Sequence, residues 1–300
     1  MNGEFFGWSA RLEQRQSRRQ SGFTLIELVM VFVLLGVLAA AFMVFFRPML
    51  NGYFSAQRRA DLSDIADSAL RRMGQELRTA VPNSINLVSN QCFQFAPSTG
   101  GGRYRREPIS GEADVACGAN PGAAHSAWPN PACAAGAVTW IDFLALQSDS
   151  NPQAGDFVVI NNVTPANYYG ASPTSRYVIQ GAGLTLPRVQ DGVGRVQLNR
   201  NPAALGYYDG RFQTVAAAQP SVMYSCTGGK LLRTIMTTNA ATACQSAGDV
   251  MASGVLACDF TYAANPSATE ASAYVSLLLS LQGDGETVSL SYGVHLDNSP

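Results

Sequence analysis

The sequence predicts an α+β fold in which a long N-terminal α-helical spine packs on a β-rich, mostly antiparallel globular head. Three observations lead to this prediction. An uncharged apolar run covers residues 28–46, and a helical pattern of apolar residues continues beyond it as far as Val81. Short runs rich in β-branched and aromatic residues, separated by Gly, Pro and Asn, then follow to the end of the chain. The spine is therefore expected to be hydrophobic in its first half and amphipathic in its second half.

The first half of the spine is long enough to cross most of a membrane. Residues 28–46 are 19 consecutive apolar residues, counting Gly36. At a rise of about 1.5 Å per residue they cover most of a hydrocarbon core about 30 Å thick. Positive charge is retained on the cytoplasmic side of a membrane, and the run is preceded by Arg11, Arg15, Arg18 and Arg19. We therefore expect a single membrane pass with a cytoplasmic N-terminus and a periplasmic C-terminus.

Glu27 lies at the start of this apolar segment, where a carboxylate is costly. An ionisable residue inside a membrane segment indicates a function and a partner still to be found. The sequence therefore singles out Glu27 as a site residue.

Gly22, Phe23 and Glu27, followed by the apolar run, resemble the class III signal of type IV pilins and type II secretion pseudopilins. The resemblance implies that a prepilin peptidase cleaves after Gly22 and methylates the new amino terminus of Phe23. An ordinary secretory signal has a shorter apolar region with a small-residue cleavage site after it. Here such a site occurs only at residues 39–41, inside the longer run. An ordinary signal and an uncleaved anchor are the two alternatives.

The signal divides the chain into four expected parts. Residues 1–22 are a cytoplasmic leader that is removed, and residues 23–47 are a transmembrane helix that becomes the core of a filament. Residues 48–81 continue as an amphipathic helix, and residues 82–300 form the head. Pro48 is expected to bend or unwind the helix, and Pro82 is expected to end it.

The amphipathic part of the spine has one apolar stripe. Apolar residues recur at steps of three and four, which is the spacing of one helical face. The stripe consists of Leu62, Ile65, Ala66, Ala69, Leu70, Met73 and Leu77.

The head is predicted to consist of short strands around a Gly/Pro-rich loop region at residues 97–136. A hairpin is expected around residues 227–230, because Thr-Gly-Gly-Lys separates two strand-like runs. The expected strands are 85–95, 138–146, 156–163, 176–180, 194–198, 221–225, 231–236, 255–262, 274–281 and 287–296.

The charge balance offers no support for nucleic-acid binding by the chain as a whole. Loss of residues 1–22 removes four arginines and two glutamates, which leaves 16 basic and 19 acidic residues and a formal charge of −3. A duplex-binding domain is usually strongly basic. A local patch of Arg103, Arg105 and Arg106 could still bind an anionic surface, including DNA, although three solvated arginines in a mobile loop are the simpler interpretation.

All six cysteines follow the membrane segment, and an even number on the exported side predicts disulfides. Cys117–Cys133 would close the Gly/Pro-rich loop and Cys226–Cys244 would close a hairpin-like segment. Cys92–Cys258 would then be left by elimination. Fifteen pairings are formally available, and the connectivity and the alternative of free buried thiols stay open.

Catalytic and metal-binding motifs are not supported. The chain has two histidines, His125 and His295, and contains no G-x-S-x-G, H-E-x-x-H or Walker sequence. Asp284, Glu286 and Asp297 are too sparse for a calcium site. No enzyme activity, metal or cofactor is therefore expected.

Three longer stretches of the sequence indicate a more specific group within the pilin-like proteins. Arg59–Met73, Gly100–Arg105 and Val255–Tyr262 together resemble the minor pilins called biogenesis protein O of the mannose-sensitive haemagglutinin (MSHA) pilus. These minor pilins are related to the J-type minor pseudopilins of type II secretion. The resemblance implies a structural role in pilus assembly and initiation at or near the filament tip.

The same resemblance implies a set of partners and locations. The partners are other major and minor pilins, the prepilin peptidase, an inner-membrane assembly platform and, before assembly, membrane lipid. The protein would lie first in the inner membrane and then in a pilus at the cell surface. A minor pseudopilin of a secretion system is the main alternative. A tip adhesin or DNA-binding pilin is a further one, although the sequence supports neither a surface ligand nor DNA.

The resemblance also suggests a role for Glu27. In a filament of this class the amino terminus of one subunit lies near this acid of a neighbour. Opposite charges attract far more strongly in a low-dielectric medium than in water. We expect Glu27 to pair with the Phe23 ammonium of an adjoining subunit and to be unpaired in an isolated chain.

Overall fold

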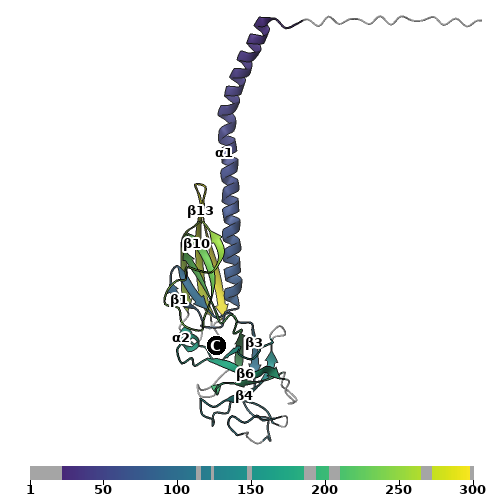
Figure 1. The fold of residues 1–300 in the computed structure, drawn as a ribbon, viewed down its shortest axis with the longest axis vertical. Coiled ribbons are helices and arrows are strands. Elements are labelled where there is room, and N and C mark those ends of the chain that lie inside the picture. The colour runs from purple at the N-terminus through teal and green to yellow at the C-terminus, as the bar shows by residue number, and fades with distance from the viewer. Residues whose placement is uncertain are drawn as a thin grey trace, which may run out of the picture. The chain divides into compact units, whose positions relative to one another are not determined.

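In a computed structural model, the chain forms two compact units, Met1–Ser55 and Ala56–Pro300. The structure describes residues 22–112, 116–122, 125–146, 151–185, 194–202, 210–264 and 272–297. The predicted α+β class is confirmed, because one long helix, α1 (Leu25–Arg78), is followed by antiparallel strands (Figure 1).

The first unit contains the apolar part of α1. Every side chain from Phe23 to Phe54 is exposed in the isolated chain. Among the described residues, α1 is the one helix that is long and apolar enough to span a membrane. A helix that is apolar on all faces must be covered by lipid or by other protein, so this segment requires a surrounding that the chain itself does not supply.

Pro48 lies inside α1 without ending it, and the helix also continues through Gly52. The sequence predicts a bend or an unwound stretch here, and the unwinding is wrong. A proline removes one backbone hydrogen bond. Several helical turns remain on each side of Pro48, and their own hydrogen bonds keep the helix continuous.

The second unit begins with the amphipathic part of α1, whose apolar stripe faces the head. The stripe predicted from the sequence is largely correct, except that Ile65 is 44% exposed. The helix ends at Arg78, before the predicted end at Val81. Its buried residues are Ala66, Ala69, Leu70, Met73, Gly74 and Leu77.

Two antiparallel sheets share a core with this stripe (Figure 1). Five strands form the first sheet, in the order β1 (Asn86–Ser89), β2 (Cys92–Phe95), β9 (Ser221–Thr227), β10 (Lys230–Met236) and β11 (Asp249–Ser253). The second sheet consists of β12 (Val255–Ala264), β13 (Ser272–Gly283) and β14 (Glu286–Asp297). The predicted hairpin is present, because β9 and β10 pair in register across Gly228 and Gly229.

Polar contacts also attach the helix to both sheets. Arg233 of β10 donates to both carboxylate oxygens of Glu76, at 3.1 and 3.0 Å. Arg59 donates to Glu286 of β14 at 2.6 Å. Gly74 permits a close approach to the second sheet, since a Cβ at this position would lie 2.5 Å from the Tyr292 ring.

The remaining strands close into a six-stranded antiparallel barrel, which the sequence does not predict. Its core is made of apolar side chains such as Ile141, Phe143 and Val196. A short helix, α2 (Pro165–Tyr169), connects two of its strands. The barrel order is β3 (Gly100–Tyr104), β4 (Thr139–Leu146), β7 (Gly194–Leu198), β6 (Arg176–Thr185), β5 (Phe157–Val159) and β8 (Arg211–Val215).

Strand β3 corrects the expectation that residues 100–106 form a mobile loop. Gly102 pairs with Leu146 on one side and with Phe212 on the other. A Cβ on Gly102 would lie 1.8 Å from the carbonyl oxygen of Ala145. The glycines are therefore needed for close approach of neighbouring strands rather than for mobility.

Candidate functional site

The predicted cleavage site precedes the helix. Gly22 and Phe23 lie outside regular secondary structure, and α1 begins at Leu25. The Phe23 side chain is 80% exposed, and a side chain at Gly22 would meet no atom within 4 Å. A peptide bond that is exposed and not helical is accessible to a peptidase.

Thr24 caps the helix, a role that our interpretation of the sequence missed. The backbone N–H of Glu27 donates to Thr24 Oγ1 at 3.3 Å and to the Thr24 carbonyl at 3.1 Å. The Thr-x-x-Glu spacing of a capping box could have revealed this arrangement. Glu27 is therefore held in the first turn of α1, where a carboxylate interacts favourably with the helix dipole.

The Glu27 carboxylate is exposed and projects from an apolar helix. No cation among the described residues of the chain forms an ion pair with it. In lipid or in packed protein this charge would need a positive partner. The described part of the first unit thus combines an accessible cleavage site, an apolar surface that needs covering and the carboxylate of Glu27 in the first turn of the helix.

All six cysteines form disulfides, but two of the expected pairings are wrong. Cys117 pairs with Cys133 as expected. Cys92 pairs with Cys244, and Cys226 pairs with Cys258. All three bonds lie in the second unit, and they stabilise it by restricting the unfolded chain.

The alternation of side chains between the two faces of a strand explains why the expected pairs Cys226–Cys244 and Cys92–Cys258 are not formed. In β9, Val222 and Tyr224 belong to the core shared with the second sheet, so Cys226 shares their inward face. It therefore reaches Cys258 on β12. Cys92 lies opposite Ser225 in the register and faces outward.

On that outward side, the segment 237–248 crosses the first sheet and brings Cys244 to Cys92. Ser221 Oγ donates to the carbonyl of Thr237 and Ser225 Oγ donates to the carbonyl of Gln245, both at 2.7 Å. Hydroxyl groups of the outward face thus hold the segment in place. Cys226, on the opposite face, is out of reach of Cys244.

The predicted patch of three solvated arginines is not formed as expected. Arg103 and Arg106 are exposed, but Arg105 is buried with only 9% of its surface exposed. Its Nε lies 3.8 Å from the carboxylate of Asp142. Arg105 therefore takes part in the interior of the head and is not available on the surface.

Asp142 is the centre of a buried charge network on the outer side of the barrel. It is fully buried and accepts hydrogen bonds from Arg195 Nε at 2.6 Å and Arg195 Nη2 at 3.1 Å. Its second oxygen also accepts the backbone N–H of Ala127 at 2.8 Å. Arg195 donates further to the carbonyls of Gly122 and His125. The network therefore joins the barrel to the loop that contains the Cys117–Cys133 disulfide.

A second carboxylate strengthens this attachment. Glu112 accepts hydrogen bonds from the hydroxyl and the backbone N–H of Ser126, at 2.6 and 2.7 Å. These bonds lower the pKa of the Glu112 carboxyl, with smaller contributions from His125 and Arg105. The loop is thus held by the carboxyl groups of Asp142 and Glu112 on two sides.

The other candidate groups are not brought together. The carbonyl of His125 belongs to the network described above, whereas His295 lies on β14 against the ring of Tyr274. Glu286 is paired with Arg59, and Asp284 lies in the turn that precedes it. The described residues contain no group of three or more side chains that could hold a metal.

Comparison with known families gives a match at the start of the chain. The model of the prokaryotic N-terminal methylation motif matches residues 17–43. No match was found among curated proteins or among solved structures.

The matched motif is the signal of type IV pilins and pseudopilins, and here it lies on an apolar helix that leads into a disulfide-bonded antiparallel head. The motif implies a structural protein that is processed by prepilin peptidase and assembles with other pilins. It fits a protein anchored in the inner membrane by its N-terminal helix.

Proposed function

We propose that this chain is a minor pilin of a type IV pilus, similar to biogenesis protein O of the MSHA pilus, and that it acts in pilus assembly at or near the filament tip. Cleavage after Gly22 and methylation of Phe23 produce the mature subunit. Residues 23–47 anchor it in the inner membrane until it enters the filament, and the head at residues 82–300 lies on the periplasmic side.

The observation that carries the proposal is the apolar helix with the methylation motif at its start. The side chains of this segment are exposed on all faces, and the motif covers residues 17–43. A membrane covers such a helix before assembly, and the equivalent helices of neighbouring subunits cover it afterwards. The three disulfides of the head suit the oxidising periplasm.

Glu27 provides the assembly contact in this proposal. Cleavage creates a positive amino group at Phe23, and a neighbouring subunit supplies the carboxylate of Glu27. Two unit charges about 4 Å apart attract by about 4 kcal/mol at an effective dielectric constant of about 20. Pairing also removes the cost of leaving either charge unpaired in the filament core. The contact would set the axial register of one subunit against the next.

The size of the head supports a minor role. About 220 residues follow the spine, and so large a head would crowd a filament in which every subunit carried one. A subunit at the tip has no subunit above it, so a large head can be accommodated there.

Mass spectrometry of the mature protein tests the class. We expect a chain that begins at N-methylated Phe23. A chain that begins at Phe42 would contradict the proposal, since this position follows the small residues of an ordinary signal site. An intact leader would indicate an uncleaved anchor instead.

A second experiment tests the role of Glu27. Glu27→Leu should be processed and inserted but should be lost from sheared pili, because no carboxylate is left for the partner's amino group. Asp61→Leu is the matched control, since it removes an exposed acid of the same helix and should leave incorporation unchanged. Normal amounts of Glu27→Leu in sheared pili would refute the contact.

A minor pseudopilin of a type II secretion system shares the same signal and helix. Deletion of the gene distinguishes the two roles: loss of surface pili supports the proposal, whereas loss of protein secretion with pili intact supports the pseudopilin.

A further inference from the structure

A disulfide-closed loop covers part of the outer side of the barrel. We call residues 116–137 the lid, of which 116–122 and 125–137 are described. Asn201 donates from its side chain to the carbonyls of Asn130 and Cys133, at 2.8 and 3.2 Å. The backbone N–H of Asp142 donates to the carbonyl of Ala127 at 2.9 Å. The lid is therefore fixed to the barrel at several points, and a pocket formed by it has a defined shape.

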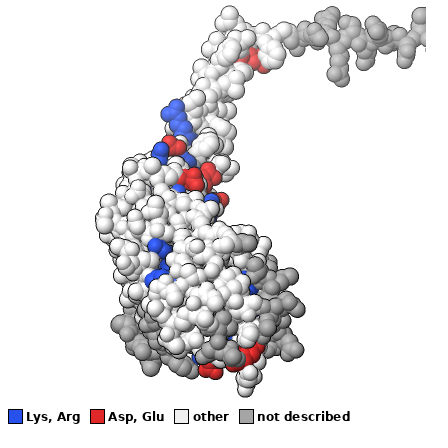
Figure 2. Space-filling view, turned by 60° about the horizontal axis from the view of Figure 1, so that its bottom comes forward, with Lys and Arg blue, Asp and Glu red and all other residues white. Residues whose placement is uncertain are grey.

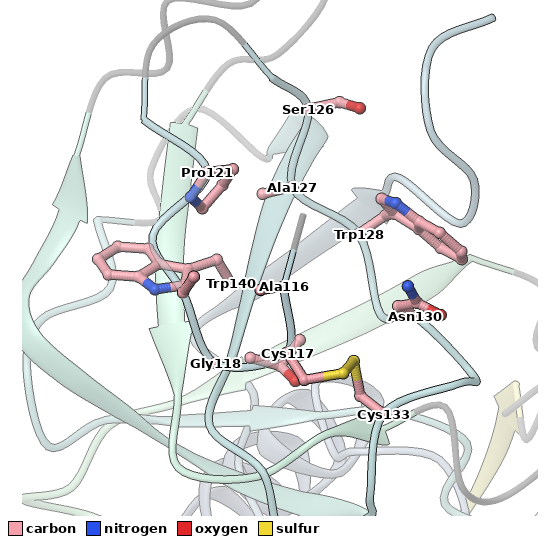
Figure 3. A pocket seen from close by; sticks show the side chains of 12 residues that line it. Ala116, Cys117, Gly118, Pro121, Ser126, Ala127, Trp128, Asn130, Cys133 and Trp140 are labelled. Carbon is pink, nitrogen blue, oxygen red and sulfur yellow. A yellow bond between two sulfur atoms is a disulfide. The ribbon is translucent and has the colours of Figure 1, made fainter. Parts of the chain in front are cut away.

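A cavity of about 40 Å³ lies against the lid and the start of β4. Figure 3 shows the indoles of Trp128 and Trp140 on either side of Ala127, with the Cys117–Cys133 disulfide nearby. Both tryptophans are half-buried. The neutral polar side chains that line the cavity are Ser126, Asn130 and Thr139.

The charge of the lining restricts the ligand. None of the described residues that line the cavity is charged, and the visible face of the second unit in Figure 2 is mostly uncharged as well. The charged groups next to the lining, Glu112 at Ser126 and Asp142 at Ala127, are already engaged in hydrogen bonds or an ion pair. A charged ligand would therefore lose hydration without gaining a free counter-charge. Indole faces and neutral hydroxyl and amide groups together suit a ligand that has both C–H faces and hydroxyl groups.

We propose that the lid pocket binds a neutral saccharide. One indole covers a C–H face of the sugar, and the side-chain amide of Asn130 donates to one of its hydroxyls. This binding site is independent of cleavage, membrane insertion and the Glu27 contact.

One side chain of the lining has a hydrogen-bond donor that is available to such a ligand. Asn130 Oδ1 accepts the backbone N–H of Ala132 at 2.9 Å, which orients the side-chain amide and leaves its N–H₂ group to donate.

The size of the cavity indicates how the sugar binds. A volume of about 40 Å³ holds about three water-sized groups, which is less than a whole hexose ring. The cavity therefore receives one substituent, such as a hydroxymethyl or acetamido group, while the ring lies against an indole. This geometry selects a terminal or branching sugar unit.

The distribution of tryptophan provides a direct assay. The chain has three tryptophans, and the one outside the pocket is Trp8 in the leader. In the full-length Trp8→Phe protein, solubilised in detergent, all tryptophan fluorescence arises from the pocket. We would titrate this protein with methyl glycosides of neutral hexoses and N-acetylhexosamines, with glucuronic acid and sialic acid as charged comparators. We expect a saturable change in fluorescence with at least one neutral glycoside.

Variants then locate the site. Trp128→Ala should raise the Kd at least tenfold, because it removes an aromatic face. Trp140→Phe replaces the indole that lines the cavity by a smaller aromatic ring, and it should also weaken binding. Each variant retains one tryptophan as a reporter. Tyr274→Ala, which removes a 40% exposed aromatic ring from the second sheet, is the matched control and should leave the Kd unchanged.

Three results would overturn the proposal. These are no saturable response to any neutral glycoside, equal or tighter binding of the charged sugars, and an unchanged Kd in Trp128→Ala. The far-ultraviolet circular dichroism of each variant should match that of the parent, so that a loss of binding is not a loss of folding.

Discussion

The buried network at Asp142 makes a quantitative prediction about the stability of the head. Asp142→Asn keeps the shape of the side chain but removes its charge. Arg195 and Arg105, which are 5% and 9% exposed, would then face a neutral group. Breaking a buried ion pair by neutralising one partner costs about 3–5 kcal/mol, because the remaining charge stays buried without compensation.

An exposed pair on α1 provides a matched control. Arg71 Nε lies 2.6 Å from Asp67, the same distance as from Arg195 Nε to Asp142. The Asp67 side chain is 47% exposed, whereas that of Asp142 is fully buried. Solvent screens the exposed pair, so Asp67→Asn should cost about 0–1 kcal/mol. The two variants make the same chemical change at the same distance and differ in burial.

Urea unfolding of the full-length protein in detergent measures the difference. Tryptophan fluorescence is a suitable signal, since Trp128 and Trp140 lie close to Asp142 in the sequence and line the adjacent lid pocket. With a denaturant dependence of about 3 kcal/mol/M, Asp142→Asn should lower the midpoint by about 1–1.7 M. Asp67→Asn should lower it by less than about 0.4 M.

A double variant tests the cause. Adding Arg195→Met to Asp142→Asn should recover part of the lost stability, because it removes one of the unpaired cations. If Asp142→Asn costs no more than Asp67→Asn, burial does not amplify the charge interaction and the reasoning is wrong.

Three further predictions concern the head. Gly102→Ala should destabilise the barrel or prevent its folding, since the added Cβ would meet the backbone of β4. Gly136→Ala is the control and should be tolerated, because no atom lies within 4 Å of the position of its Cβ. The melting temperatures of the two variants test this. Glu112→Gln should reduce the loss of stability in acid. The lowered pKa of Glu112 contributes stability that is complete above about pH 4.3 and is lost as the pH falls through the folded-state pKa. Unfolding measured over a pH series tests this, and equal slopes of the unfolding free energy against pH in the variant and the parent would refute it. Peptide mapping without reduction should identify three cross-links, Cys117–Cys133, Cys92–Cys244 and Cys226–Cys258. A cross-link between a cysteine of the second pair and a cysteine of the third pair would contradict the structure.

The disulfides show where prediction from the sequence stops. Cys117 and Cys133 are 16 residues apart and close a local loop, so proximity in the chain was a good guide to their pairing. Cys92 and Cys244 are 152 residues apart. Their pairing depends on which strand lies beside β2 and on which face each side chain points to. A shift of one residue in register would reverse that face.

The glycine run shows a related limit. A Gly-rich stretch favours a mobile loop when it is considered alone, because glycine lacks a side chain and is conformationally permissive. In the folded head the same stretch is strand β3, with a neighbouring strand on each side. Arg105 follows it into the interior, where Asp142 offers a charge partner that no local pattern indicates.

By itself, the sequence determined the local features: the methylation signal, the apolar and amphipathic parts of α1, most of the strands and the α+β class. These depend on residue type and on periods of a few residues, which each short segment contains in full. The tertiary structure alone decided the closed barrel, the pairing of the distant cysteines, the burial of Arg105 and the pocket between the lid and β4. Each of these features arises from contacts between segments far apart in the chain. The energies of these contacts depend on the strand register, on the face to which each side chain points and on burial, and these are defined only after the segments have packed together.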